Sequence, residues 1–199
     1  MRARLALHVS GRRCVLREIV LRDKAAAFLA ASPKGTVPVL VMPDGGVIEE
    51  SLEIMLWALD GADPEQWLVP PSGDLAAMLG LVEASDTGFK ADLDAYKYAS
   101  RGTPEAALAA RAHGAQFLLT LDGRLSGQRY LFGDRLALAD MAIFPFVRQF
   151  ANVDRQWFDG EAWPCLRRWL DELLASPRFA AVMKKYPKWQ PGDDVVLFG

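Results

Sequence analysis

The sequence predicts a small mixed α/β domain followed by an all-helical domain. In about the first sixty residues, short β-prone runs alternate with short helical runs. Glycine and proline then gather between residues 61 and 73, which is typical of a linker. From residue 74 onward, apolar side chains recur at helical spacing. We therefore expect domains at 1–61 and 74–199, joined by a linker at 62–73.

The first domain is expected to open with a helix, because Met, Arg, Ala and Leu favour helices, and Gly11 should end it. A helix that follows Asp23 must end before Pro33, since proline disfavours a helical residue before it. Asp44-Gly45-Gly46 is typical of a hairpin turn. In chain order, the expected elements are a helix over 1–9, a strand over 14–20, a helix over 24–31, strands over 37–42 and 47–50, and a helix from Ser51 to about Leu59.

The second domain is expected to contain helices alone. Pro104 suits the first turn of one helix, whereas Gly80 and Gly88 are weak points in another. The expected helices cover 74 to about 100, 104 to about 125, 139–152, 164–176 and 178–185.

The composition excludes several classes of protein. The chain has 199 residues with 23 Lys and Arg against 25 Asp and Glu, so it lacks the basic footprint of a nucleic-acid-binding protein. No uncharged run approaches the roughly 20 apolar residues of a membrane span, and the N-terminus lacks a signal-peptide pattern. The two cysteines and two histidines form no metal-site spacing. We therefore expect a soluble, cytoplasmic protein that uses no metal and binds neither nucleic acid nor membrane.

Four segments carry a resemblance to a known family. Residues 32–40 read Ser-Pro-Lys-Gly-Thr-Val-Pro-Val-Leu, Asp44-Gly45 follows, and residues 47–55 read Val-Ile-Glu-Glu-Ser-Leu-Glu-Ile-Met. In the helical half, residues 138–145 read Leu-Ala-Asp-Met-Ala-Ile-Phe-Pro. Together they resemble the glutathione S-transferase family, in which a thioredoxin-like domain precedes a helical bundle. The likeness extends over essentially the whole chain, although the thioredoxin-like domain is truncated at its start.

The resemblance implies that glutathione lies against Val37 and Pro38. In the family the bond between these two positions is cis, which turns the valine backbone toward the tripeptide so that glutathione pairs as an added strand. The residues alone predict instead a proline on an edge strand, since most bonds before proline are trans.

Glu50 and Ser51 stand where a strand becomes a helix, so the helix N-terminus would attract a carboxylate there. The resemblance implies that Ser51 donates to the γ-glutamyl carboxylate of glutathione and that Glu50 accepts its ammonium. The alternative is simple helix capping by Ser51 with Glu50 as a favourable charge. The resemblance implies that Lys34 meets the glycyl carboxylate; the alternative is a solvated loop lysine.

Phe89 and Tyr96 are expected to share one face of the first long helix of the second domain, because they are seven residues apart. The resemblance places the pocket for the second substrate on this helix, and a half-apolar surface with polar tips suits a ligand. The same spacing is also that of core residues, so packing within the bundle is the alternative.

The catalytic residue is expected just upstream of Met1. Relatives whose first helix reads like residues 1–7 place a strand and a Cys-Pro-containing loop before it, and that loop carries the nucleophile. One interpretation is that Met1 is a misassigned or truncated start. The other is a genuine variant without that strand, whose sheet is completed by rearrangement, by strand exchange between subunits, or by another segment. The β-prone tail 194–198 is one such segment, although a terminus that is docked on the surface or disordered is more usual. We expect Cys14 and Cys165 to pack as small apolar residues rather than to act as nucleophiles.

Asp140 is expected to cap the helix that begins near residue 139. The family usually pairs this aspartate with a Ser or Thr three residues earlier, where this chain has Ala137, so only the carboxylate half of the cap is retained.

These observations predict an enzyme that binds glutathione and transfers it to a small hydrophobic electrophile, or exchanges its thiol with a disulfide. A Cys-type thiol exchange fits residues 1–7 better than a Tyr- or Ser-type conjugation, by analogy. The alternative is a non-catalytic glutathione-binding or interaction module, and a purely structural helical protein is a third. The resemblance also implies a homodimer.

Overall fold

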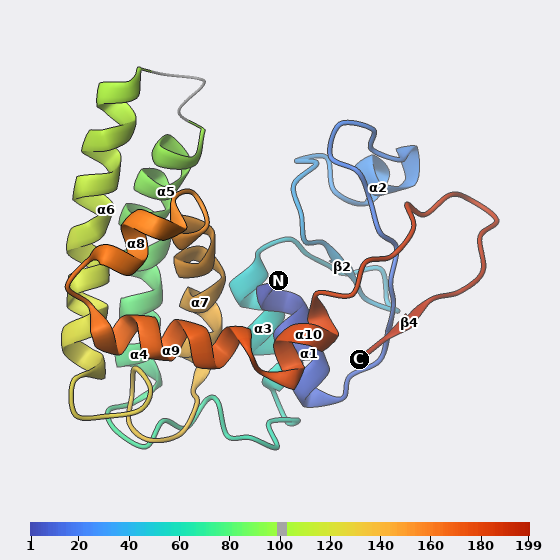
Figure 1. The fold of residues 1–199 in the computed structure, drawn as a ribbon. Coiled ribbons are helices and arrows are strands. Elements are labelled where there is room, and N and C mark those ends of the chain that lie inside the picture. The colour runs from blue at the N-terminus through green and yellow to red at the C-terminus, as the bar shows by residue number, and fades with distance from the viewer. Residues whose placement is uncertain (99–102) are drawn as a thin grey trace. The chain divides into compact units, whose positions relative to one another are not determined.

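The computed structural model describes residues 1–98 and 103–199, which form two compact units (Figure 1). Unit 1 contains residues 1–65 together with 177–199, and unit 2 contains residues 66–176. The first boundary lies within the linker expected from the sequence. The segment 177–199 differs from the expectation, because it packs with the first unit rather than with the helical one.

Unit 1 combines three packed helices with two small antiparallel sheets. Helices α1 and α3 pack against each other, and α10 packs on α1 (Figure 1). Their buried side chains include Leu5 and Ala6 of α1 and Met55 and Leu59 of α3. Strand β1 pairs with β4, and β2 pairs with β3. The elements of unit 1 are α1 (Arg2–Ser10), β1 (Cys14–Val15), α2 (Ala26–Ala31), β2 (Leu40–Val41), β3 (Val47–Ile48), α3 (Ser51–Leu59), α10 (Pro177–Val182) and β4 (Leu197–Phe198).

The helix boundaries of unit 1 follow the sequence more closely than the strand boundaries do. Gly11 ends α1 in the left-handed conformation, with φ of 67°, as predicted. The strand expected over 14–20 is reduced to two paired residues, and so is the strand expected over 37–42. A ladder needs a partner, and each of these strands finds one over only part of its length.

The C-terminal tail supplies the partner of β1. Cys14 pairs with Phe198 and Val15 with Leu197, and the Leu16 N–H donates to the Val196 carbonyl over 2.8 Å. The tail therefore forms a strand, which the sequence offered as the less usual outcome.

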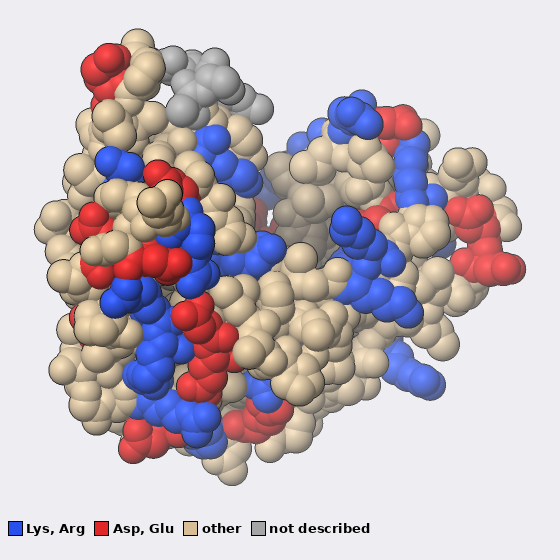
Figure 2. All heavy atoms as spheres, viewed as in Figure 1, with Lys and Arg blue, Asp and Glu red and all other residues tan. Residues whose placement is uncertain are grey.

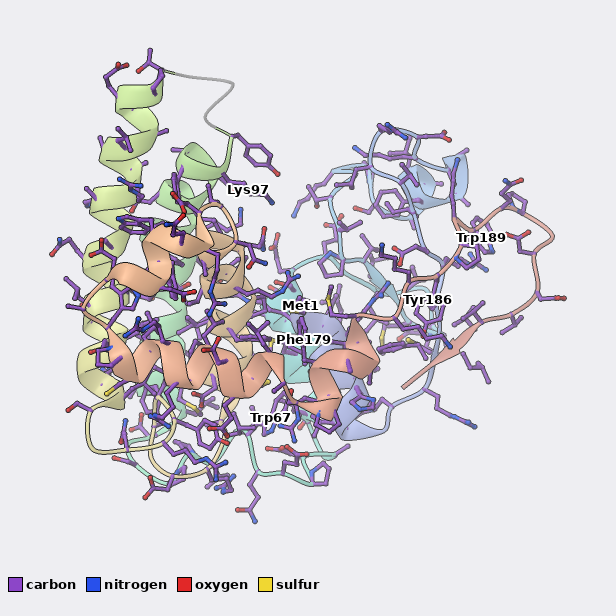
Figure 3. The ribbon with its side chains drawn as sticks, viewed as in Figure 1. Met1, Trp67, Lys97, Phe179, Tyr186 and Trp189 are labelled. Carbon is purple, nitrogen blue, oxygen red and sulfur yellow. The ribbon has the colours of Figure 1, made fainter. Side chains whose placement is uncertain are left out.

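Aromatic side chains hold the tail to the rest of unit 1. The Arg4 guanidinium lies 5.6 Å from the ring centre of Tyr186 and 5.7 Å from that of Phe198, and it forms an ion pair with Glu18. Trp189, labelled with Tyr186 in Figure 3, lies 4.6 Å from the guanidinium of Arg17. Arg4 thus links α1 both to Glu18, in the segment after β1, and to the tail.

Replacing Phe198 with alanine is expected to lower the free energy of unfolding by about 2 kcal/mol, because its ring is only 8% exposed. Val195 in the same tail is 68% exposed, so Val195→Ala should change the stability by less than about 0.5 kcal/mol. Urea unfolding of the three proteins measures both values. Equal midpoints for Phe198→Ala and the parent chain would show that the Phe198 ring contributes nothing to the stability of unit 1.

Unit 2 is a helical bundle. The long helix expected from residue 74 is interrupted by a π-helical turn at 85–89, which contains the expected weak point Gly88. Its expected end near Ser100 lies outside the described residues. The elements are α4 (Leu75–Ala84), η1 (Ser85–Phe89), α5 (Lys90–Lys97), α6 (Pro104–Leu125), α7 (Leu138–Ala151), α8 (Arg155–Gly160) and α9 (Pro164–Leu174).

Charges of both signs alternate on the face of unit 2 formed by α8 and α9 (Figure 2). Arg155 forms ion pairs with Asp159 and Asp171, and Arg129 pairs with Glu172. Among the described residues, no helix has enough consecutive apolar length to cross a bilayer.

The centre of unit 2 is organised around the start of α7. Asp140 is completely buried, and its carboxylate accepts hydrogen bonds from the Leu131 N–H (2.9 Å), the Ala137 N–H (3.0 Å) and the Trp169 indole N–H (2.8 Å). Because Ala137 has no hydroxyl, the cap is one-sided. Burial raises the pKa of Asp140 to about 6, although all three donors favour its charged form.

Candidate functional site

The candidate site of unit 1 is formed by two chain segments. The first is the loop 32–38, which follows α2, and the second is the junction 49–51 between β3 and α3. The bond between Val37 and Pro38 in the loop is cis, which confirms the expectation drawn from the resemblance. Among the described residues, the Val37 N–H and carbonyl have no backbone partner, and the Val37 side chain is half-exposed. This backbone is therefore available to a ligand.

The start of α3 is open to an anion. Ser51 is the first residue of this nine-residue helix, and Glu50 occupies the N-cap position. Within the described residues, the Glu50 side chain makes no capping hydrogen bond, so it leaves the first-turn N–H groups without that partner. The plain capping role for Ser51 is therefore wrong, because Ser51 lies one residue inside the helix. Uncapped N–H groups and the helix dipole together favour a bound carboxylate.

Lys34 reaches from the loop to the junction. Its ammonium lies 3.4 Å from a carboxylate oxygen of Glu49 and 3.7 Å from one of Glu50. Both Lys34 and Glu50 are well exposed, so water screens these two ion pairs and each contributes little to stability. The structure thus brings together two of the residues predicted for the site, Lys34 and Glu50, and keeps both accessible.

Glu49 is a member of this cluster that the sequence reasoning missed. Its Oε1 accepts a hydrogen bond of 2.5 Å from the hydroxyl of Ser32, which is completely buried. The Ser32 hydrogen bond is the largest influence lowering the pKa of Glu49, and the Lys34 charge lowers it further. The sequence signal for this residue is the pair Glu49-Glu50 before Ser51, of which only Glu50 was assigned a role.

The structure corrects the prediction for Phe89 and Tyr96. Both side chains are buried in unit 2, at 2% and 7% exposure, where they cannot line an open pocket. The Phe89 ring stacks on Phe117 at 5.0 Å, and both Phe89 and Tyr96 contact Phe150. The packing alternative therefore holds, because the spacing that aligns two residues on a helix face serves a core as well as a cleft.

Neither cysteine belongs to the cluster of Lys34, Glu49, Glu50 and Ser51. Cys14 lies in β1, and burial raises the pKa of its thiol, which disfavours the nucleophilic thiolate. Cys165 lies on α9 in unit 2.

The comparisons with known proteins match both halves of the chain. The model of the glutathione S-transferase N-terminal domain matches residues 1–67, and that of the C-terminal domain matches residues 103–172. A probable glutathione S-transferase of Zea mays, BZ2, is 31% identical over 92% of this chain and 84% of the maize protein. Glutathione S-transferase AN1595 of Emericella nidulans is 27% identical over 81% of this chain, which spans 62% of the fungal protein.

Solved structures share the fold of this chain. BphK, a bacterial glutathione S-transferase, superposes with a TM-score of 0.78 at 22% identity, over 92% of each chain. A glutathione transferase family member from Pseudomonas fluorescens, solved with two glutathione bound, gives a TM-score of 0.76 at 18% identity, over 91% of this chain and 86% of that one. The predicted class, a thioredoxin-like domain followed by a helical one, is confirmed. The chain belongs to the glutathione S-transferase family.

Proposed function

We propose that this chain binds glutathione in unit 1, between the loop 32–38 and the start of α3. The γ-glutamyl carboxylate lies at the N-terminus of α3 with the Ser51 hydroxyl as a donor, and Glu50 accepts the ammonium. The backbone of Val37, beside Pro38, pairs with the tripeptide as an added strand. Lys34 meets the glycyl carboxylate as a point charge. The observation that carries this proposal is the uncapped start of α3, with an exposed carboxylate and an exposed ammonium within 3.7 Å of each other beside it.

Charge complementarity supports glutathione over a simple anion. A γ-glutamyl group carries one carboxylate and one ammonium on the same carbon, so it needs an anion site and a carboxylate close together. The start of α3 and Glu50 supply that pair. The family relationship and the Pseudomonas fluorescens structure with two glutathione bound support the same ligand.

The proposed reaction is transfer of glutathione to a small hydrophobic electrophile, or exchange of its thiol with a disulfide. In the transfer, the thiol loses its proton, its sulfur bonds to the electrophilic carbon, and the leaving group departs with the bonding electrons. In the exchange, the thiolate attacks one sulfur of the disulfide and the other sulfur leaves as a thiolate. We also propose that the chain is cytoplasmic and forms a homodimer, as the family relationship implies.

A non-catalytic glutathione-binding module is the second candidate. This candidate needs no reactive thiol, and Cys14, whose pKa burial raises, supplies none at neutral pH. In this case the fold and the glutathione site are retained without the chemistry.

Retention on immobilised glutathione tests binding, and two assays test the chemistry. One follows conjugation of glutathione to an aryl halide, and the other follows reduction of a mixed glutathione disulfide. Retention with turnover in either assay supports the transferase, whereas retention without turnover supports the binding module. Failure of the chain to bind glutathione would contradict both candidates.

A further inference from the structure

A direct hydrogen bond joins the two segments of the candidate site, between residues that are 17 positions apart in the chain. The Ser32 hydroxyl donates to Glu49 Oε1 over 2.5 Å. Ser32 stands at the start of the loop that carries Lys34 and Val37. Glu49 immediately precedes Glu50 and Ser51 at the start of α3. We call this Ser32–Glu49 hydrogen bond the latch.

Ser32 is fixed on its backbone side. As the C-cap of α2, it donates its N–H to the Phe28 carbonyl within that helix, and its own carbonyl accepts from the Gly35 N–H, each over 2.9 Å. Gly35 is buried with φ of +62°, and a Cβ added there would meet Lys24 at 3.1 Å and Leu29 at 3.3 Å. The loop is therefore tightly packed at its start. A change in the position of Ser32 consequently also displaces the loop residues that follow it.

Glu49 is held by both of its oxygens. While Oε1 accepts from Ser32, Oε2 lies 3.4 Å from the Lys34 ammonium. The contact to Lys34 is an exposed ion pair, which contributes little, whereas a hydrogen bond from a buried hydroxyl to an ionised acceptor contributes more. The Ser32 hydrogen bond is therefore the stronger of the two restraints on Glu49.

We propose that the latch positions the loop 32–38 against the start of α3 and thereby sets the affinity of the site for glutathione. This inference rests on the proposed function, and it assigns to Glu49 a positioning role rather than contact with the ligand. A tripeptide that spans the loop and the helix start binds well only if the distance between the two is fixed before it arrives. The latch supplies that restraint.

Four variants separate the hydrogen bond from the charge of Glu49. Ser32→Ala and Glu49→Ala each remove the latch. The double variant removes the same hydrogen bond, so the two losses should not add. Glu49→Gln removes the charge but keeps an amide oxygen that accepts from the Ser32 hydroxyl. Glu53→Ala is the matched control, because Glu53 is an exposed acidic residue in the first turn of the same helix.

Calorimetric titration with glutathione is expected to show about tenfold weaker binding for Ser32→Ala and for Glu49→Ala, and no further loss in the double variant. Glu49→Gln and Glu53→Ala should stay within about threefold of the parent chain. A loss in Glu49→Gln as large as that in Glu49→Ala would overturn the latch, because it would mean that the charge carries the effect. Unchanged affinity in Ser32→Ala would overturn it as well.

Amide hydrogen exchange at Gly35 tests the latch without any ligand. Because the Gly35 N–H donates to the Ser32 carbonyl, its exchange should become about tenfold faster in Ser32→Ala and Glu49→Ala, and stay near the parent rate in Glu49→Gln. Unaltered exchange in the first two variants would overturn the positioning role even if the parent chain fails to bind glutathione. Failure of the parent chain to bind, with the expected changes in exchange, would refute the proposed function and leave the positioning of the loop supported.

Discussion

Replacing Asp140 with alanine is expected to lower the free energy of unfolding by about 4 kcal/mol, the largest stability effect that we expect in this chain. The carboxylate is completely buried and accepts from three N–H donors, those of Leu131, Ala137 and Trp169. Alanine leaves all three donors buried without an acceptor, at about 1–3 kcal/mol each if no water replaces the carboxylate. It also removes the remaining half of the α7 cap.

Chemical unfolding measures this loss, and two variants divide it. Trp169→Phe keeps an aromatic ring and removes one donor, so it should cost about 1–3 kcal/mol. Asp134→Ala is the control, since the Asp134 carboxylate accepts an exposed hydrogen bond from the Arg129 backbone N–H, and its loss should cost less than about 1 kcal/mol. A loss in Asp140→Ala no larger than in the control would contradict the assignment of this carboxylate as the centre of unit 2.

The same carboxyl gives unit 2 a pH dependence whose sign follows from its pKa. Burial raises the pKa of Asp140 from 3.8 to about 6, so between these values the folded chain holds more protons than the unfolded chain. The stability contributed by this group is complete below pH 3.8, falls as the pH rises from 3.8 to about 6, and is lost above that, by up to about 3 kcal/mol. The amide introduced by Asp140→Asn does not titrate, so this variant should gain stability relative to the parent chain as the pH rises from about 4 to about 7. A constant difference across this range would contradict the raised pKa.

Glu50→Gln is expected to weaken glutathione binding by about 10- to 100-fold, because it removes the charged acceptor proposed for the ligand ammonium. Ser51→Ala removes a hydroxyl donor at the helix start and should weaken binding by about tenfold. Calorimetric titration with glutathione measures both. Because Glu50 and Ser51 are not buried, neither change should shift the unfolding midpoint appreciably.

Glu53→Gln is the matched control for this second prediction, because it removes one negative charge from the same helical turn. A general electrostatic effect would alter the affinity in Glu53→Gln and Glu50→Gln alike, whereas a specific contact alters it in Glu50→Gln only. If Glu50→Gln binds glutathione as tightly as Glu53→Gln does, Glu50 has no direct role in holding the ligand.

Local signals in the sequence predicted the ends of helices α1 and α3 well. Gly11 and the run after Ser51 marked helix ends within one or two residues, because such signals act on their own neighbours. Lys34 and Glu50 were assigned to one site from the family pattern, and the structure places their charges 3.7 Å apart. These features depend on residues near in sequence or on a pattern shared by relatives.

Features that depend on distant partners could not be predicted in the same way. Strand lengths at β1 and β2 depend on which segments pair with them, and the partner of β1 lies at the opposite end of the chain. The Ser32–Glu49 hydrogen bond joins positions separated by 17 residues, with no pattern that links them. Phe89 and Tyr96 show a further limit, since their spacing is the same in a core as in a cleft.

In the proposed complex, glutathione lies between the Val37 backbone and the start of α3. Titration of the isotope-labelled chain with glutathione, followed by amide chemical shifts, tests it most directly. We expect the amides of Val37 and Ser51 to shift together with a single dissociation constant, and both shifts to be smaller in Glu50→Gln at the same glutathione concentration. Shifts confined to residues 66–98 and 103–176, or no shift at either amide at millimolar glutathione, would contradict it.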